Sequence, residues 1–271
     1  MIVMRTPSLF LLAATAAGCS SPARAAATPW RRPVLVELYT SQGCSSCPPA
    51  DAFVRQLPAL GLGRDKVVPL TFHVDYWDRL GWKDPYASGA FTERQEWYAR
   101  SSKLRSPDGA AGLDGLYTPQ MIVDGAVQFS GQRRQTAVRE LETAAARPPA
   151  FDLTVRAAVK GTTVDLTVQS APVGAAAPER DWRLIAALAA KTTHTAVARG
   201  ENAGETLEEA AVVRALSDRI AMPMQRSATQ IRLSKPADLA WSGVELVVFA
   251  QSEVTREIGA VRIIDARQIA P

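Results

Sequence analysis

The hydrophobic pattern near the start of the chain predicts a β-strand, an α-helix and a second β-strand. Residues 34–40 form a short run rich in β-forming side chains, which favours a strand. From Pro48 onward apolar residues recur at helical spacing, and proline suits the first turn of a helix. Residues 66–74 have the continuous apolar pattern of a strand that is buried on both faces. These elements predict a βαβ unit whose two strands pair in parallel.

The next part of the chain is longer and rich in aromatic residues. Residues 91–103 have the pattern of a helix, and residues 107–115 have that of a loop. Asp124-Gly125 lies between two apolar runs, which predicts a hairpin of two antiparallel strands. Residues 135–146 are expected to form a helix that closes this α/β domain.

The hydrophobic period changes after the proline pair at residues 148–149. Apolar residues then alternate with polar ones in several short segments separated by turns, which predicts a small β-sandwich. Residues 205–216 fit either a helix or a strand, and residues 199–204 are expected to be a structural turn. The predicted organisation is an α/β domain over residues 30–147 followed by an all-β, sandwich-like domain over residues 150–271.

Residues 1–27 have the pattern of an export signal. A short basic start with Arg5 precedes an apolar segment at residues 7–18, and small residues that suit a cleavage site follow. Cleavage at residues 23–25 would release a free protein, whereas Cys19 ends a segment that resembles a bacterial lipobox and would carry a lipid anchor. Both routes predict an exported protein that is periplasmic or secreted.

Composition and charge fit a folded soluble protein and argue against nucleic-acid binding and against a transmembrane segment. Hydrophobic residues make up 47% of the 271 residues and charged residues 21%, an ordinary balance for a soluble protein. The net charge of +4 is scattered along the chain instead of gathered in a basic stripe, so no nucleic acid is expected as a partner. Beyond the first twenty residues no apolar stretch is long enough to span a bilayer, so no transmembrane segment is expected in the mature protein.

Cys44 and Cys47 form a C-x-x-C motif between the first predicted strand and helix. Backbone N–H groups point outward at the start of a helix and stabilise a thiolate, which lowers the pKa of the thiol. Disulfides form and persist outside the reducing cytosol. The motif therefore predicts a redox-active disulfide, with Cys44 as the exposed attacking thiol and Cys47 as the resolving thiol.

Two other roles for this cysteine pair stay open. The leading interpretation needs no cofactor apart from the redox-active disulfide. The alternative is a bound Cu(I) ion, because Cys44, Cys47 and His73 are ligands that suit Cu(I). A purely structural disulfide is the second alternative, although such disulfides usually close longer loops. No zinc site is expected, because tetrahedral zinc usually takes four protein ligands. Apart from Cys19 in the predicted export signal, the chain has two cysteines and two histidines, and His194 belongs to the other predicted domain.

Several segments together carry a resemblance to known families. VELYTSQGCSSC and the downstream YTPQMIVDG resemble the thioredoxin superfamily, in which a C-x-x-C motif faces a cis-proline loop. The closer resemblance is to a mostly bacterial, secreted family, domain of unknown function 1223, which FHVDYWDRLGWKDPYAS, FTERQEWYA and RGENAGETL also resemble. The resemblance implies a thioredoxin-like fold for residues 30–147.

The same resemblance implies roles for particular residues. Cys44 and Cys47 would be the redox pair, and Thr118 with a cis Pro119 would form the loop that faces them. Glu37, on the strand that leads to Cys44, would be a buried acid near the pair.

Four more polar and aromatic residues follow at the end of the second predicted strand, the edge where α/β folds bind their ligands. They are His73, Asp75, Tyr76 and Trp77. We expect them to form an acid–base wall beside the cysteines, with the alternative that Trp77 caps the core.

These observations favour an exported thiol–disulfide oxidoreductase that acts on protein or small-molecule thiols and disulfides. A periplasmic protein that binds or delivers copper or a thiol cofactor, using the same two cysteines, is the alternative from another class. Fold alone does not decide between them.

Overall fold

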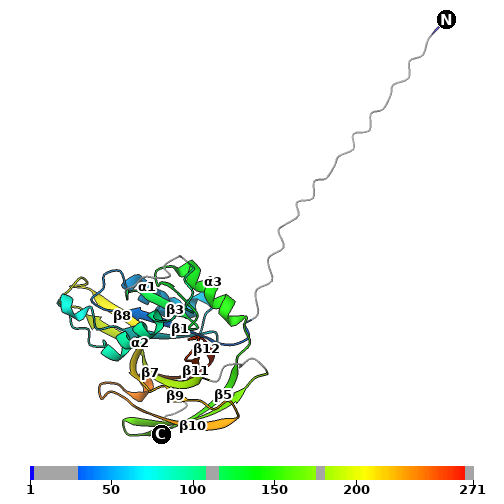
Figure 1. Ribbon diagram of the computed structural model, residues 1–271. Coiled ribbons are helices and arrows are strands. Elements are labelled where there is room, and N and C mark those ends of the chain that lie inside the picture. The colour runs from blue at the N-terminus through cyan, green and yellow to red at the C-terminus, as the bar shows by residue number, and fades with distance from the viewer. Residues whose placement is uncertain (3–29, 108–115, 175–180, 266–271) are drawn as a thin grey trace.

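The structure is a computed structural model that describes residues 1–2, 30–107, 116–174 and 181–265. The predicted export signal, with Cys19 and all but its first two residues, lies outside the described residues, as does most of the predicted loop at 107–115. Figure 1 shows the helices above a large sheet and a smaller sheet below it.

The first half of the chain contains all three α-helices of the described part. Its elements, in order, are β1 (Val34–Thr40), α1 (Pro48–Gln56), the 3-10 turn η1 (Pro58–Leu60), β2 (Val67–His73), η2 (Asp78–Leu80), α2 (Gly89–Ala99), β3 (Gln120–Val123), β4 (Val127–Ser130) and α3 (Arg134–Ala145).

The second half consists of strands and one short 3-10 turn over its described residues. Its elements are β5 (Phe151–Lys160), β6 (Thr163–Pro172), β7 (Trp182–Ala196), β8 (Thr206–Leu216), β9 (Ile220–Ala221), β10 (Ser227–Ser234), η3 (Trp241–Gly243), β11 (Val244–Ser252) and β12 (Ile258–Asp265).

The predicted βαβ unit and hairpin are confirmed. β1 pairs with β2 in parallel along its whole length, and β3 adds to the other side of β1 in the antiparallel sense. Asp124 and Gly125 turn the chain between β3 and β4 with positive φ angles of 55° and 67°. Gly125 is needed for a second reason, because a Cβ atom built there would lie 1.9 Å from the carbonyl oxygen of Arg256.

The predicted fold class, an α/β thioredoxin-like domain followed by a small sandwich-like β domain, is wrong. The structure is mostly β, with 43% strand and 18% helix. Nine strands from both halves form one mixed sheet, in the order β12-β11-β7-β8-β2-β1-β3-β4 with β9 beside β7, and β10-β6-β5 form a second sheet. The two halves meet where β8 pairs in parallel with β2.

The error has a physical cause. Alternation of apolar and polar residues identifies a strand, but it does not say which strand will be its neighbour. β7 and β11 are buried along most of their length, which requires cover on both faces. One face packs on the small sheet, and the other packs against residues of β1, β2 and α2. Their edges are paired inside the large sheet, between β12 and β8. The predicted domain boundary stays a prediction, and it falls in the link between α3 and β5.

The ambiguous segment at residues 205–216 is a strand, β8. It pairs with β7 in the antiparallel sense from Thr206 to Leu216, with a register shift between Leu188 and Ala189 of β7. The expected helix at 91–103 is confirmed as the shorter α2, and that at 135–146 as α3.

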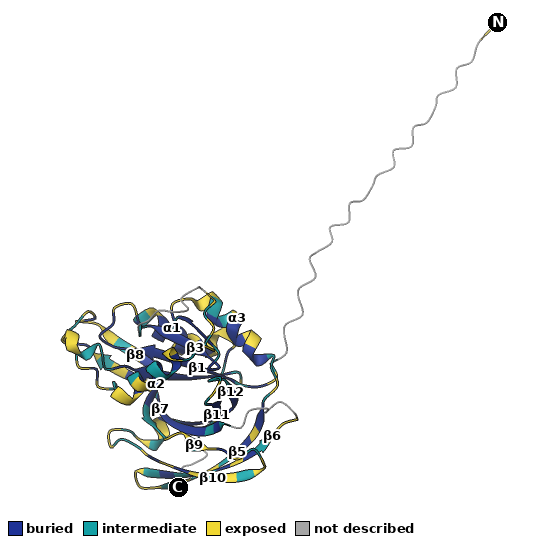
Figure 2. Ribbon diagram, viewed as in Figure 1, coloured by how far each residue is buried: buried dark blue, intermediate teal, exposed yellow. Residues whose placement is uncertain are grey.

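The hydrophobic core forms three clusters on the faces of these sheets. α1 and α3 cover one face of β1 and β3. The alternate residues of β1 point to the other face and join residues of β2, α2, β7 and β11. The third cluster fills the space between the small sheet and β7, β11 and β12. Figure 2 shows the buried strands of the large sheet beneath helices whose outer surfaces are exposed.

A buried ion pair ties α2 to β1 on the face away from α1. Arg94 donates to both carboxylate oxygens of Glu37 at 2.8 Å. The hydroxyl groups of Tyr98 and Tyr39 donate to the same carboxylate at 2.6 and 3.0 Å, and Arg94 also donates to Gln251 of β11. Glu37 is therefore fully used by the core, as a buried charge must be.

No helix among the described residues is long and apolar enough to cross a membrane.

We predict that Gly125→Ala destabilises the protein more than Gly161→Ala. Both glycines have positive φ, 67° and 60°, but a Cβ on Gly125 meets the Arg256 backbone whereas one on Gly161 meets nothing within 4 Å. Gly161→Ala should cost about 1 kcal/mol, the usual cost of an alanine at positive φ, and Gly125→Ala clearly more. Denaturant unfolding midpoints compare the two, and equal losses would contradict the close approach of Arg256.

Candidate functional site

Cys44 and Cys47 form a disulfide at the start of α1. Their Cα atoms are 5.5 Å apart, and Cys47 is the residue that caps the N-terminus of the helix. Both cysteines are 0% exposed, while Ser45 and Ser46 between them are exposed. The expectation that Cys44 is an exposed thiol is therefore wrong for this structure.

The burial of Cys44 has a cause that lies far away in the sequence. The loop between β7 and β8, at residues 199–204, packs on the cysteine turn. The Asn202 side chain donates to the carbonyl oxygens of Gln42, at 2.9 Å, and of Cys44, at 3.0 Å. The Glu201 carboxylate accepts from the backbone N–H of Ser45 at 2.9 Å and from its hydroxyl at 2.7 Å. This loop is more than the structural turn that the sequence predicts.

Trp82 packs against the loop at residues 199–204. A Cβ on Gly200, whose φ is +80°, would lie 3.0 Å from the Cβ of Trp82, so only glycine allows this approach. The indole N–H of Trp82 donates to the side-chain oxygen of Gln42 at 3.2 Å. Trp82 thus links the loop to the residue just before the cysteine turn.

Gln42 connects the cysteine turn to a cluster of buried ionisable residues. Its backbone N–H donates to Asp84 at 2.8 Å, and its side-chain amide donates to Glu209 of β8 at 3.0 Å. His73, at the end of β2, lies between these two acids. Its Nδ1 is 2.7 Å from Asp84 Oδ2, and its Nε2 is 3.8 Å from Glu209 Oε1.

Asp51 completes this cluster from the helix side. It lies four residues after Cys47 on α1, a spacing that places two residues on the same side of a helix. Its carboxylate accepts from the Thr40 hydroxyl at 3.1 Å, and its charge interacts with those of Glu209, His73 and Asp84. We call Asp51, His73, Asp84 and Glu209 the acid–base cluster.

Burial and mutual charge change the pKa values of this cluster. Burial, and then the Glu209 charge, raise the pKa of Asp51 to about 7. Burial alone would lower the pKa of His73, but Asp84 and Glu209 outweigh it and raise that pKa to about 9. The His73 charge and hydrogen bond lower the pKa of Asp84 despite its burial. Near neutral pH, His73 is therefore an imidazolium, and Asp51 is the group that titrates.

Three atoms of the cluster have no hydrogen-bond partner in the described part of the chain, namely Asp51 Oδ1, His73 Nε2 and Glu209 Oε1. Buried polar atoms are nearly always paired, so such atoms call for an explanation, which includes a functional role or a water. The cluster is able to take up and release a proton behind the disulfide.

Only one residue of the predicted acid–base wall joins this cluster. His73 belongs to it, whereas Asp75 accepts from the Thr92 hydroxyl at 2.6 Å and the Tyr76 hydroxyl donates to Gln95 at 3.3 Å, both on α2. Trp77 packs on the cysteine turn, because a Cβ on Gly43 would lie 3.3 Å from the Cβ of Trp77. Glu37 lies on the opposite face of β1, in its ion pair with Arg94.

The Thr118–Pro119 peptide bond is cis, as the sequence resemblance implies. The Pro119 carbonyl accepts from the Gly131 N–H at 2.9 Å. A Cβ on Gly131 would lie 3.2 Å from Pro119 Cβ and 2.9 Å from Ala50 Cβ, so this glycine separates the proline from α1. The next residue, Gln132, donates to the Ser46 carbonyl at 2.7 Å. Direct contact between Pro119 and the disulfide stays a prediction.

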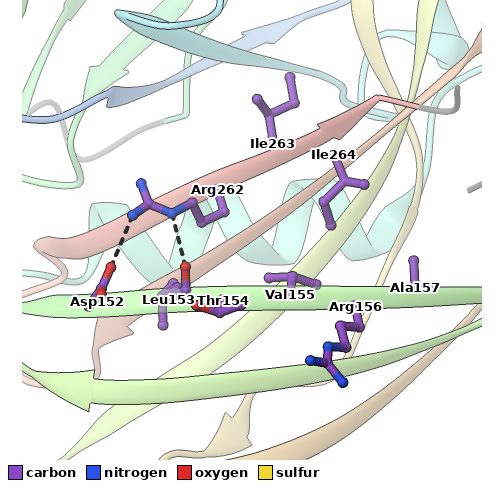
Figure 3. Close-up of a pocket in the computed structure, with 9 residues that line it drawn as sticks. All are labelled: Asp152, Leu153, Thr154, Val155, Arg156, Ala157, Arg262, Ile263 and Ile264. Atoms are coloured by element: carbon purple, nitrogen blue, oxygen red, sulfur yellow. Dashed lines mark hydrogen bonds and ion pairs between the residues drawn. The ribbon is translucent and has the colours of Figure 1, made fainter. Parts of the chain in front are cut away.

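A hollow elsewhere in the molecule has no part in this site. It has a volume of about 570 Å³ and lies between the edge strands β5 and β12 (Figure 3). Arg262 crosses it to the Leu153 carbonyl and the Asp152 carboxylate, at 2.9 and 3.1 Å. Its lining shares no residue with the cysteine turn or the acid–base cluster.

Comparison with known proteins places the chain in a family. The model of the family described as a protein of unknown function, DUF1223, matches residues 35–251. The chain belongs to the DUF1223 family. The matched range includes the cysteine turn, the loop at 199–204 and the whole acid–base cluster.

Two solved structures share the fold of this DUF1223 chain. One is a protein from Agrobacterium tumefaciens, with 24% identity, a TM-score of 0.62, and coverage of 88% of this chain and 96% of that one. The other is HBP35 of Porphyromonas gingivalis, with 10% identity, a TM-score of 0.60, and coverage of 90% and 78%. No curated protein matches the chain. These similarities concern the fold alone.

The residues of this candidate site that sequence reasoning missed are Asp51, Asp84, Glu201, Asn202 and Glu209. Asp51 alone carried a local signal, because an acid four residues after Cys47 falls on the buried side of a helix that begins at Pro48. Asp84 reaches the site from the segment between η2 and α2, through its contacts with Gln42 and His73. Glu201, Asn202 and Glu209 reach it through the pairing of β8 with β2 and β7, which no local pattern reveals.

We predict that the DUF1223 protein loses stability as pH rises from 5 to 9. Asp51 and His73 both have a higher pKa in the folded protein than their ordinary values of 3.8 and 6.5. The folded state therefore binds more protons than the unfolded state, so stability is lost between pH 4 and 7 for Asp51 and between pH 6.5 and 9 for His73. Urea unfolding at pH 5, 7 and 9 measures the trend.

Asp51→Asn isolates the first part of that loss. Between pH 5 and 7 the free energy of unfolding of the variant should fall by less than that of the wild type, because the titrating acid is gone. The difference should be on the order of 2 kcal/mol. Asp65→Asn, at an exposed position, is the matched control and should follow the wild type. A wild type whose stability rises over this range would show that Asp51 is ionised at low pH.

Proposed function

We propose that this protein is an exported thiol–disulfide oxidoreductase that uses Cys44 and Cys47 as a reversible redox pair. The observation that carries the proposal is the position of the disulfide, at the N-terminus of α1 and next to a buried cluster that titrates near neutral pH. A structural disulfide needs neither feature. The export signal predicted for residues 1–27 supports the proposal, because disulfides persist outside the cytosol.

The reaction is thiol–disulfide exchange with a protein or small-molecule thiol. A thiolate of the partner attacks the Cys44 sulfur, forms a mixed disulfide and breaks the Cys44–Cys47 bond, so Cys47 leaves as a thiolate and takes up a proton. A second partner thiolate then attacks the mixed disulfide, which releases Cys44. The pair gains two electrons, the partner becomes a disulfide, and the reverse sequence oxidises a dithiol partner.

Two local features stabilise a thiolate in the reduced pair, and the first acts on Cys44 alone. The Ser46 hydroxyl lies 3.3 Å from the Cys44 sulfur and is able to donate a hydrogen bond to it. The start of α1 adds its backbone dipoles to the same region. Both stabilise negative charge on sulfur, and a stabilised thiolate is the reactive form of a cysteine.

Burial of the disulfide adds a step before exchange. Both sulfur-bearing residues are fully buried, whereas the Ser45–Ser46 tip of the turn is exposed and held only by hydrogen bonds. A partner thiolate reaches the sulfur when this tip moves aside. Exchange is therefore expected to be slower than with an open disulfide of the same potential.

We predict that the pair is reduced reversibly in the folded protein. Alkylation should add no label to the oxidised protein and two labels per mature chain to the reduced protein. After equilibration in glutathione buffers, the fraction of reduced protein should follow the buffer potential. Cys44→Ala and Cys47→Ala controls assign the labels. A disulfide that resists reduction until the protein unfolds would mark a structural bridge. Stoichiometric, tight Cu(I) binding by the reduced protein would instead favour the copper-binding alternative.

We predict that Cys44 has a lower thiol pKa than Cys47. Iodoacetamide reactivity against pH in the Cys47→Ala and Cys44→Ala variants measures each thiol separately. Ser46→Ala should raise the pKa of Cys44, because it removes the hydroxyl donor beside that sulfur, and should leave Cys47 unchanged. Equal and slow alkylation of the two thiols would contradict the assignment of Cys44 as the attacked and attacking sulfur.

A further inference from the structure

The loop from the other half of the chain brings a negative charge to the cysteine turn. Glu201 is exposed, and its carboxylate binds the backbone N–H and the hydroxyl of Ser45, the residue next to Cys44. Those two hydrogen bonds lower the pKa of the Glu201 carboxyl, so it is ionised at neutral pH. Asn202 fixes the register of this contact by holding the Cys44 carbonyl.

This placement works against a thiolate at Cys44 in two ways. A carboxylate near a thiolate repels it, which raises the thiol pKa. The carboxylate also occupies the N–H and hydroxyl of Ser45, the residue that follows Cys44, so these donors are not free to stabilise a thiolate. Neither effect touches the oxidised pair, because a disulfide has no charge.

We propose that Glu201 is a positioning residue that sets the reduction potential of the Cys44–Cys47 pair by raising the pKa of the Cys44 thiol. The inference rests on the proposed redox function. A carboxylate that destabilises the reduced form alone makes the pair a stronger reductant, so Glu201 biases exchange toward the disulfide and toward reduction of partner disulfides. Thus a residue on the β7–β8 loop shifts the redox equilibrium of the cysteine pair at α1 toward the disulfide.

The test compares Glu201→Gln with Glu205→Gln. The glutamine at position 201 keeps an oxygen that accepts from Ser45 but loses the charge, and Glu205 is an exposed acid near the end of the same loop. Both variants keep the acid–base cluster, Arg134, which contacts the Pro49 carbonyl, and Arg199 of the same loop. The thiolate absorbance of the reduced protein against pH gives the thiol pKa, and equilibration with glutathione at pH 8 gives the potential.

We expect Glu201→Gln to lower the pKa of the Cys44 thiol and to shift the glutathione equilibrium toward the dithiol by about threefold, the size typical of one exposed charge nearby. The shift should shrink at high salt, because salt screens exposed charges. Glu205→Gln should match the wild type, and unfolding midpoints should show that all three proteins are folded to the same extent.

The outcomes separate the inference from the function beneath it. If the wild-type pair exchanges with glutathione but Glu201→Gln has the wild-type pKa and potential, the role of Glu201 is refuted and the redox function stands. A shift of equal size in Glu205→Gln would show a general charge effect and would also refute it. If the folded wild type is never reduced, the proposed function fails, and the inference fails with it.

Discussion

The contact between β2 and β8 is the constraint on which the rest of the site depends. The two strands pair in parallel at Thr71 and Val212, and the Thr71 hydroxyl donates to the Ala210 carbonyl at 2.8 Å. This junction joins the two halves of the chain into one sheet. It also places Glu209 beside His73 and brings the loop that precedes β8 onto the cysteine turn. Separated halves would have the cysteines without their surroundings.

Two buried charge networks in this sheet differ in how completely their groups are paired. The Glu37 carboxylate receives four hydrogen bonds or ion-pair contacts from Arg94 and two tyrosines, so it is completely paired. The acid–base cluster instead sets three carboxylates against His73 alone and leaves buried atoms unpaired. An incompletely paired buried network is costly. The large sheet thus holds one completely paired buried carboxylate and, next to the disulfide, a group of buried carboxylates that is not completely paired.

Local elements follow from the sequence, whereas the site does not. Pro48 and the apolar spacing after it predict α1, and Asp124-Gly125 predicts the hairpin, because these rules act within one or two turns of chain. The partner of β2 depends on which buried strand satisfies its free edge, and β8 lies more than a hundred residues away in the sequence. That single unpredicted pairing explains both the wrong fold class and the absence of Glu201 and Glu209 from the predicted site. His73 was found because it ends a strand that local rules do predict.

Two neighbouring residues of the loop at 199–204 hold the cysteine turn, and they differ in burial. Asn202 is buried and holds backbone carbonyls, so its bonds persist unless the loop itself leaves the cysteine turn. Glu201 is exposed and holds the Ser45 tip, so its bonds exchange readily with water. The tip can therefore open while the loop stays docked through Asn202. In that arrangement the loop at 199–204 still holds the backbone carbonyls of Gln42 and Cys44 while the Ser45 tip is released.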